Sequence, residues 1–310
     1  MNKTRSLLLD FILYFMARTL GCVLQALSPG LALRVVHALA NLGYHVDKRH
    51  RQVALDNLAH AFPQTSQDER KHLVRKVYRH FGMLLLEMLL ILRKLSPHNW
   101  RRRITLPTDV EAKLQAAFSS GRPVLIVTAH FGNWELSAHC LSLFGVKAHL
   151  VARPLDNPFV DALVQRFREW RGHKVLGKSG SLFAMHGVLA KGGVLCTLAD
   201  QDAGPDGLFV DFFGRPASTH KAIAALALWS RALILVMGLE NTGGFLQYTL
   251  RLTDVIQPEE YAGKAKSAVA ITQRITHGVE RLVRHDPGQY LWLHRRWKHQ
   301  PGDKKGKQAA

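Results

Sequence analysis

The amino-acid sequence predicts an α/β protein, a mixed sheet flanked by helices, with an N-terminal hydrophobic anchor helix and a helical N-terminal region. Three observations support this prediction. From residue 123 onward, short apolar runs typical of strands alternate with longer segments typical of helices. Residues 30–100 have helical patterns, and residues 7–27 form a long apolar stretch. The expected organisation is an anchor helix at 1–29, one α/β domain at 30–300 with its helical part at 30–100, and a disordered basic tail at 301–310.

The first apolar stretch, residues 7–27, is long enough to cross a bilayer, which takes about 20 residues. On a helix, its polar residues Asp10, Tyr14, Arg18 and Gln25 form one narrow stripe and leave the rest of the circumference apolar. Such a helix spans the membrane with its stripe against protein, lies in the interface, or packs as a core helix. Arg18 argues against a cleaved signal peptide, so we expect an uncleaved membrane anchor.

The remaining elements follow in chain order. Helices are expected at 31–42, 53–61 and 66–95, the last with Ser66 and Glu69 in capping-box register. Its apolar part, residues 83–95, is either a core helix or an apolar wall beside a site for an acyl chain. Strands are expected at 123–128, 147–152, 193–198, 233–238 and 245–252, and helices at 158–171, 182–190, 219–231 and 264–284.

The charge balance points to an anionic partner. Lys and Arg number 42 against 23 Asp and Glu, which gives a formal net charge of +19. Nucleic acid, an anionic membrane, an acidic protein and a phosphorylated substrate all fit this charge. The three cysteines form no Cys-x-x-Cys pair, so neither a zinc site nor a disulfide framework is indicated.

A base and a carboxylate follow the first predicted strand, in the run Ala-His-Phe-Gly-Asn-Trp-Glu. The chain has 17 histidines, so the His-x4-Glu spacing alone is a weak signal. On a continuous helix His130 and Glu135 would point about 140° apart, and they converge only if the backbone breaks between them. Gly132 permits such a break, and Asn133 is suited to cap the following helix. We therefore predict that Glu135 accepts from one imidazole nitrogen of His130 and leaves the other as a base.

Further polar residues follow the next predicted strands. Arg153 precedes a proline-rich bend and is either a solvated turn residue or an anion or oxyanion contact in the cleft of His130. Asp200, Gln201 and Asp202 follow the third predicted strand. Paired acids suggest a metal, but no neighbouring His or carboxylate cluster supports one, so we expect none. Asp200 is instead expected to orient Arg153 or a substrate hydroxyl.

Two later segments are candidate anion sites. Gly214 makes a turn, and Ser218 and Thr219 are expected to open a helix whose N-terminus, flanked by Arg215 and Lys221, would hold a phosphate. The run Trp-Leu-His-Arg-Arg-Trp-Lys at 292–298 is basic and aromatic. It fits a nucleic-acid patch, a membrane-interface patch, an anionic substrate groove or an ordinary amphipathic surface. A G-x-S-x-G elbow, a P-loop, H-E-x-x-H and G-x-G-x-x-G are all absent from the sequence.

Taken together, these residues resemble the bacterial lipid A biosynthesis acyltransferase family, over almost the whole chain. The order and spacing of the short motifs make the resemblance specific. The motifs are Asn57-Leu58 with Phe62-Pro63, His130 to Glu135, Arg153-Pro154 with Asn157-Pro158, Asp200-Gln201-Asp202, Phe212-Phe213-Gly214 with Thr219, and Tyr290 to Lys298.

The resemblance implies a glycerolipid-acyltransferase-like fold and acyl transfer from acyl carrier protein to a hydroxyl of a phosphorylated, acylated glucosamine disaccharide. The reaction is then expected at the cytoplasmic face of the bacterial inner membrane, with the anionic leaflet as a partner and with no nucleic acid, metal or further cofactor. The implied catalytic residues are His130, Glu135, Arg153 and Asp200. The implied substrate-binding residues are Asn133, Trp134, Asn157, Gln201, Gly214, Arg215, Thr219, Arg295 and Arg296.

In the mechanism expected from these residues, His130 takes the proton of the acceptor hydroxyl as it attacks the thioester carbonyl. Glu135 orients the imidazole, and Arg153 stabilises the oxyanion. Three competing interpretations remain at this point: the same chemistry on another glycolipid, an aminolipid or a polyketide-like alcohol, a thioesterase that uses water, and a membrane-associated nucleic-acid-binding protein.

Overall fold

A seven-stranded mixed sheet forms the centre of the protein, in a computed structural model that describes residues 6–177 and 181–303. The strand order is β1-β9-β8-β2-β5-β3-β4, and β8 and β9 form the antiparallel pair. A separate hairpin joins β6 and β7. The strands are β1 Ile104–Thr105, β2 Val124–Thr128, β3 Ala148–Ala152, β4 Lys174–Gly177, β5 Val194–Leu198, β6 Leu208–Phe212, β7 Arg215–Thr219, β8 Leu233–Asn241 and β9 Tyr248–Ile256.

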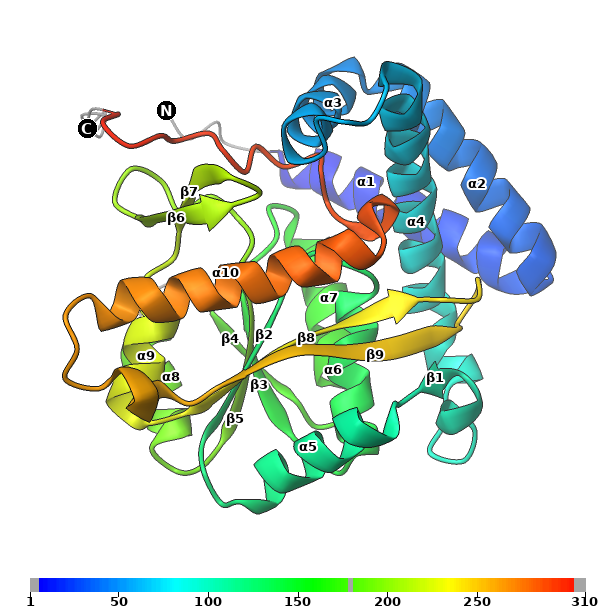
Figure 1. The fold of residues 1–310 in the computed structure, drawn as a ribbon. Coiled ribbons are helices and arrows are strands. Elements are labelled where there is room, and N and C mark those ends of the chain that lie inside the picture. The colour runs from blue at the N-terminus through cyan, green and yellow to red at the C-terminus, as the bar shows by residue number, and fades with distance from the viewer. Residues whose placement is uncertain (1–5, 178–180, 304–310) are drawn as a thin grey trace.

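Helices cover both faces of this sheet, so the predicted fold class is confirmed (Figure 1). Four helices gather at one end of the molecule before the first strand, as expected for the helical N-terminal region. The α-helices are α1 Leu7–Ala26, α2 Pro29–Val46, α3 Lys48–Ala61, α4 Gln67–Lys94, α5 Thr108–Ser119, α6 Trp134–Leu143, α7 Pro158–Glu169, α8 Ser181–Leu189, α9 Ala222–Ser230 and α10 Ser267–His285.

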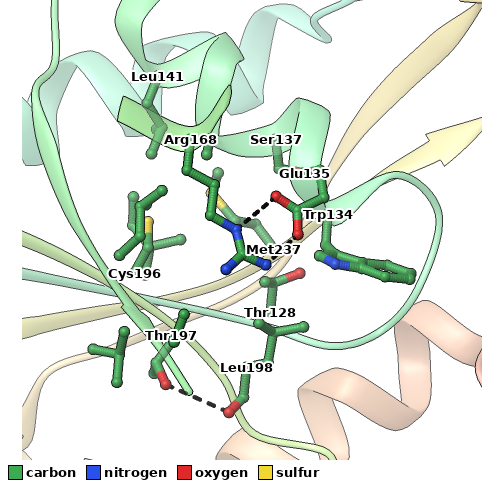
Figure 2. A pocket seen from close by; sticks show the side chains of 15 residues that line it. Thr128, Trp134, Glu135, Ser137, Leu141, Arg168, Cys196, Thr197, Leu198 and Met237 are labelled. Atoms are coloured by element: carbon green, nitrogen blue, oxygen red, sulfur yellow. Dashed lines mark hydrogen bonds and ion pairs between the residues drawn. The ribbon is translucent and has the colours of Figure 1, made fainter. Parts of the chain in front are cut away.

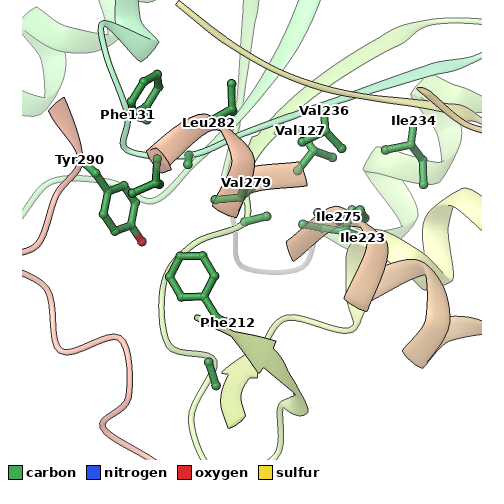
Figure 3. Packing of buried hydrophobic residues seen from close by; sticks show 14 of the residues in the cluster. Val127, Phe131, Phe212, Ile223, Ile234, Val236, Ile275, Val279, Leu282 and Tyr290 are labelled. Carbon is green, nitrogen blue, oxygen red and sulfur yellow. The ribbon is translucent and has the colours of Figure 1, made fainter. Parts of the chain in front are cut away.

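Strand β2 is buried throughout, and its alternate side chains pack into two different cores because successive residues point to opposite faces. Leu125 and Val127 face the core that α8, α9 and α10 cover. Figure 3 shows that core, where side chains of α10 pack over β2 and β8. Val124 and Ile126 face the second core, which α5 and α6 cover. A strand buried on both faces explains why its sequence is an uninterrupted apolar run.

Helix α4 begins one residue after its predicted start, with the expected capping box. The Ser66 backbone N–H donates to Glu69 at 2.6 Å, and the Glu69 N–H donates to the Ser66 hydroxyl at 3.2 Å. Leu86 and Leu90, in the stretch expected to be either core or an acyl-site wall, pack against α1 and α2. This stretch contributes core residues, and none of its described residues lines the cavities near His130.

Some elements differ from the prediction. Strands β1, β4, β6 and β7 were not expected, because they are only two to five residues long. Helix α5 was also not expected, although its buried residues Val110, Leu114 and Ala117 follow a helical spacing. The predicted helix 219–231 begins only at Ala222, since Thr219 is the last residue of β7. Of the predicted disordered tail, residues 301–303 form the end of a turn, and residues 304–310 lie outside the described part of the chain.

Candidate active site

His130 lies two residues after β2, at the carboxyl edge of the sheet, and a tight turn fixes its backbone. Gly132 has φ +57°, and a side chain there would collide with the backbone carbonyl of Leu239. That carbonyl accepts a hydrogen bond from the Asn133 N–H at 3.0 Å. The His130 carbonyl accepts from the Leu291 N–H at 3.0 Å. The break at Gly132 is therefore as predicted, and it is held by strand β8 and the C-terminal segment.

The carboxylate that binds the imidazole is Asp200, which corrects the prediction that Glu135 does so. His130 Nδ1 lies 2.9 Å from Asp200 Oδ1, and the His130 backbone N–H donates to Asp200 Oδ2 at 3.0 Å. Asp200 follows β5, the neighbour of β2, so the parallel register brings the two strand ends together. Among the described residues, none hydrogen-bonds to Nε2 of His130. The ring therefore has one oriented nitrogen and one available nitrogen.

Glu135 is instead held by an arginine of α7. Arg168 donates to its two carboxylate oxygens at 2.5 and 3.0 Å, and both side chains are largely buried (Figure 2). The geometry is the bidentate fork that arginine forms best with carboxylate. The sequence did not single out Arg168, because it is one of several basic residues on a predicted helix and its spacing carries no signal. The carboxylate on the first turn of α6 was correctly placed, but its partner was missed.

Charge and burial act in opposite directions on the imidazole. Burial of His130 favours its neutral form, but the charge and hydrogen bond of Asp200, with the charge of Glu135, outweigh it and raise the pKa of His130. Burial would likewise raise the pKa of Asp200, yet its contacts with His130 hold that pKa below its usual range. The pair is therefore arranged to stabilise an imidazolium ion beside a carboxylate.

A cavity of about 830 Å³ opens beside His130, between the sheet and helices α8 and α9. Its lining includes His130, Trp134, Arg153, Arg168 and Gln201. The prediction that Arg153 shares a cleft with His130 is confirmed, although its side chain is 77% exposed at the rim. The Trp134 ring lies edge-on to the imidazole, with ring centroids 5.1 Å apart.

A smaller apolar cavity lies on the opposite face of the sheet, and the Glu135–Arg168 pair stands at its wall (Figure 2). Leu141, Cys196 and Met237 line it further in. Arg168 and Trp134 line both cavities, so they stand where the two spaces approach each other. This arrangement places a cation and an aromatic ring between the large cavity of His130 and the smaller apolar one.

Two predicted substrate-binding residues are helix caps. Asn133 caps α6 by accepting from the Leu136 N–H, and its amide donates to Glu87 of α4. Asn157 caps α7, and its amide donates to the backbone carbonyl of Asp10 at 2.8 Å. Both are buried. Asparagine at a helix N-cap satisfies free backbone amides, which explains these residues without a substrate.

The predicted phosphate cradle at a helix N-terminus is wrong, because Ser218 and Thr219 lie in β7. Arg296 is buried and donates to the Ser218 carbonyl at 2.6 Å and to the Thr219 hydroxyl at 2.7 Å. Its guanidinium therefore fixes the hairpin to the C-terminal segment. The hairpin turn itself contains Gly214, at φ +76°, followed by Arg215.

The C-terminal basic and aromatic run is only partly a surface. Trp292 and Trp297 are buried in the core, as is Arg296, whereas Arg295 is exposed. A continuous nucleic-acid or membrane patch over 292–298 is therefore wrong, because its aromatic residues are inside the protein. Among residues 6–177 and 181–303, the structure also contains no group of three His, Cys, Asp or Glu side chains able to hold a metal ion.

Comparison with known proteins gives matches over most of the chain. The family model described as bacterial lipid A biosynthesis acyltransferase matches residues 1–299. The Escherichia coli lipid A biosynthesis palmitoleoyltransferase is 29% identical over 263 residues, covering 82% of this chain and 80% of that protein. The E. coli lipid A biosynthesis lauroyltransferase is 29% identical over 272 residues, covering 85% of this chain and 84% of that protein. A phosphatidylinositol mannoside acyltransferase of Mycobacterium tuberculosis is 29% identical over 157 residues, covering 44% of this chain and 49% of that protein.

Proposed function

This chain belongs to the bacterial lipid A biosynthesis acyltransferase family, and it is therefore an acyltransferase. On that premise we propose that it moves a fatty acyl chain from acyl carrier protein to a hydroxyl of a phosphorylated lipid A precursor. The observation that carries the proposal is the His130–Asp200 pair at the wall of the large cavity. Such a pair supplies the base that an alcohol needs before it attacks a thioester.

The proposed reaction is a direct transfer. His130 Nε2 removes the proton of the acceptor hydroxyl while the hydroxyl oxygen attacks the carbonyl carbon of the thioester. The carbon–sulfur bond of the thioester then breaks. Asp200 keeps the proton of the neutral ring on Nδ1 and stabilises the imidazolium that forms. The imidazolium returns its proton to the leaving thiolate. Every group in this sequence is a side chain or a substrate, so the proposal includes no further cofactor.

The cations near His130 have separate proposed roles. Arg168, held by Glu135, lies close enough to the cleft to stabilise the oxyanion of the tetrahedral intermediate. Exposed Arg153 at the rim binds an anionic group of a substrate, either a phosphate of the acceptor or an acidic side chain of acyl carrier protein. Glu135 thus acts through Arg168 and through its charge, without binding the ring.

The proposed location is the cytoplasmic side of the bacterial inner membrane. Helix α1 is long and apolar enough to cross a membrane. The net charge of +19 suits an anionic leaflet, an acidic carrier protein and a phosphorylated acceptor together. The burial of Trp292, Arg296 and Trp297 removes one of the two sequence features that fitted nucleic acid, the basic and aromatic run, and leaves only the net charge.

The test is product analysis by mass spectrometry. The purified full chain is incubated with acyl carrier protein thioesters of graded length and a phosphorylated disaccharide lipid. We expect a singly acylated product, and a loss of about 10²–10⁴-fold in rate for His130→Ala. Near-normal turnover of that variant would contradict the role of His130. Accumulation of an acyl-enzyme when the acceptor is withheld would contradict direct transfer.

A second acceptor class is favoured by one comparison. The relative from M. tuberculosis is named for a phosphatidylinositol mannoside, which is a glycolipid of another type. Running the same assay with a phosphoinositol glycolipid beside the disaccharide distinguishes the two acceptors by product mass. A reaction without either acceptor measures hydrolysis, and fast hydrolysis there would support a thioesterase instead.

A further inference from the structure

Helix α1 is fixed to the globular part of the protein at both of its ends. In its first turn, the backbone carbonyl of Asp10 accepts from the Asn157 amide at 2.8 Å. In its last turn, the Gln25 amide donates to the Leu89 carbonyl of α4 at 2.8 Å. Between these points, the rings of Tyr14 and Phe159 lie with centroids 5.8 Å apart. The helix is therefore attached along its length and does not project from the domain.

The two elements that hold α1 are not membrane segments. Helix α7 carries Asp161, Arg166 and Arg168, and Arg168 belongs to the site beside His130. Helix α4 meets α1 at Leu86, Leu89 and Leu90, beside buried Glu87, which is bound to Asn133. If α1 crossed a bilayer with these contacts intact, Glu87 of α4 and the charged residues of α7 would be carried toward the hydrocarbon, where a charged side chain costs several kcal/mol (about 2.5–3.5 at the centre).

The rest of α1 is an open apolar surface. One side of the helix faces protein: Asp10, Gly21 and Leu24 are buried, and Tyr14 and Gln25 are half-buried. Ten large apolar side chains point outward with exposed fractions between 45% and 69%, namely Leu7, Leu8, Leu9, Phe11, Ile12, Leu13, Phe15, Met16, Leu20 and Val23. An apolar face of this size, broken only by Thr19, marks a surface that something apolar covers.

We infer that α1 lies flat in one leaflet of an anionic bilayer, with this open face in the acyl region and the side of Asp10, Gly21 and Leu24 on the protein. Exposed Arg18 lies at the edge of the apolar face, where it reaches lipid phosphates. The occupant is a lipid surface because the face runs the whole length of a helix in a chain of net charge +19. A helix in this position is immersed about 5–10 Å.

This placement brings the cavity mouth to the membrane. Asn157, which binds α1, is two residues after Leu155, and Leu155 lines the cavity of His130 and is 41% exposed. The acceptor's sugar then reaches His130 while its acyl chains stay in the leaflet. The inference rests on the proposed membrane location but on neither the acyl donor nor the identity of the acceptor.

Three positions make the orientation measurable. Leu8, Phe15 and Cys22 are seven residues apart and fall within about 40° on the exposed face, over about 21 Å of helix. The native thiol of Cys22 is exposed, whereas Cys140 is buried and burial raises the pKa of Cys196 to about 12. A single environment-sensitive fluorophore is therefore attached to wild-type Cys22, and to Leu8→Cys or Phe15→Cys in a Cys22→Ser background.

The labelled full chains are bound to vesicles of phosphatidylethanolamine and phosphatidylglycerol that carry nitroxide quenchers at a shallow or a deep acyl position. We expect the same depth at all three positions, to within a few ångströms. A spanning helix instead gives depths that differ by most of about 21 Å along the helix. If the protein binds the vesicles but shows that gradient of depth, the in-plane inference is wrong, while the proposed membrane location still stands.

Lys113→Cys on exposed α5 is the matched control, because α5 lies at the opposite end of the molecule from α1 (Figure 1). Its label is expected to show no quenching. Absence of binding to vesicles by every labelled chain would contradict the membrane location in the proposed function as well. Equal quenching at Lys113→Cys would mean nonspecific adsorption and would also overturn the inference.

Discussion

His130 and Asp200 are joined twice, through the ring and through the backbone. Oδ1 of Asp200 lies 2.9 Å from Nδ1, and Oδ2 accepts the His130 backbone N–H at 3.0 Å. Because both oxygens accept, the carboxylate fixes the position of the turn and the tautomer of the ring at once. Asp200 is 3% exposed, so this contact is shielded from competing water.

Replacing Asp200 by asparagine tests this double contact. The asparagine oxygen must accept from the His130 N–H, so its NH₂ group faces Nδ1 and drives the ring proton to Nε2, the wrong tautomer. We expect Asp200→Asn to lose about 10²–10⁴-fold in turnover with its circular dichroism spectrum unchanged. Glu135→Gln is the comparison, because it removes a carboxylate that does not bind the ring. A larger loss in Glu135→Gln than in Asp200→Asn would restore the original pairing of Glu135 with His130.

The pH dependence of activity has a definite sign. The base must be neutral, and the pKa of His130 is raised above its usual value near 6.5 because the charge of Asp200 outweighs burial. Activity is therefore expected to fall as the pH drops through an apparent pKa above 6.5. In Asp200→Asn that apparent pKa moves down. A kcat/KM profile of the folded enzyme measures both values, and an unchanged apparent pKa in the variant would contradict the pairing.

The His130–Asp200 pair makes the free energy of unfolding depend on pH, with stability lost both at high and at low pH. The raised pKa of His130 contributes stability that is complete below its unfolded value near 6.5 and is lost as the pH rises through the folded value. The lowered pKa of Asp200 contributes stability above its unfolded value near 3.9, which is lost as the pH falls through the folded value. The stability gap between wild type and Asp200→Asn is thus expected to be largest between about pH 4 and 6.5. Urea unfolding at pH 5 and pH 8 measures it.

Except for α5, local sequence signals predicted the α-helices and most central strands, because the patterns of these elements are local. β2 is a buried apolar run, α4 has a capping box, and the turn at Gly132 has its glycine and its capping asparagine. The end of β7 was taken for the start of a helix because Ser218 and Thr219 are residues that are common at helix N-termini, and the hairpin itself was not predicted. Its strand pairing depends on a partner segment that periodicity does not reveal.

The sequence predicted three of the residues at the candidate site, but not which of them contact one another. His130, Asp200 and Glu135 were all named, but the choice between two carboxylates is made by the order of β2 and β5 in the sheet. Strand order is a tertiary property and has no signature at either residue. Arg168 was missed for the same reason, since only the packing of α7 against α6 shows which arginine reaches Glu135.

The Glu135–Arg168 pair has a stability consequence. Glu135 is 7% exposed, so Arg168→Gln leaves a buried carboxylate without its partner. We expect a loss of about 3–5 kcal/mol in the free energy of unfolding. The double variant Glu135→Gln with Arg168→Gln removes both charges and is expected to recover part of that loss. Urea unfolding of the two single variants and the double variant gives the coupling, and additive losses would show that the pair is not coupled.

The turn that carries His130 depends on a glycine that no other residue replaces. At Gly132 the backbone has φ +57°, and an added Cβ would overlap the Leu239 carbonyl, which already accepts from the Asn133 N–H. We expect Gly132→Ala to lower the free energy of unfolding by about 3 kcal/mol or more and to abolish activity, because the turn must move. Gly214→Ala is the matched control. Its φ is +76°, but its surroundings are open, so only the left-handed backbone cost of about 1–2 kcal/mol applies. Equal losses in the two variants would show that the contact with Leu239 does not constrain the turn.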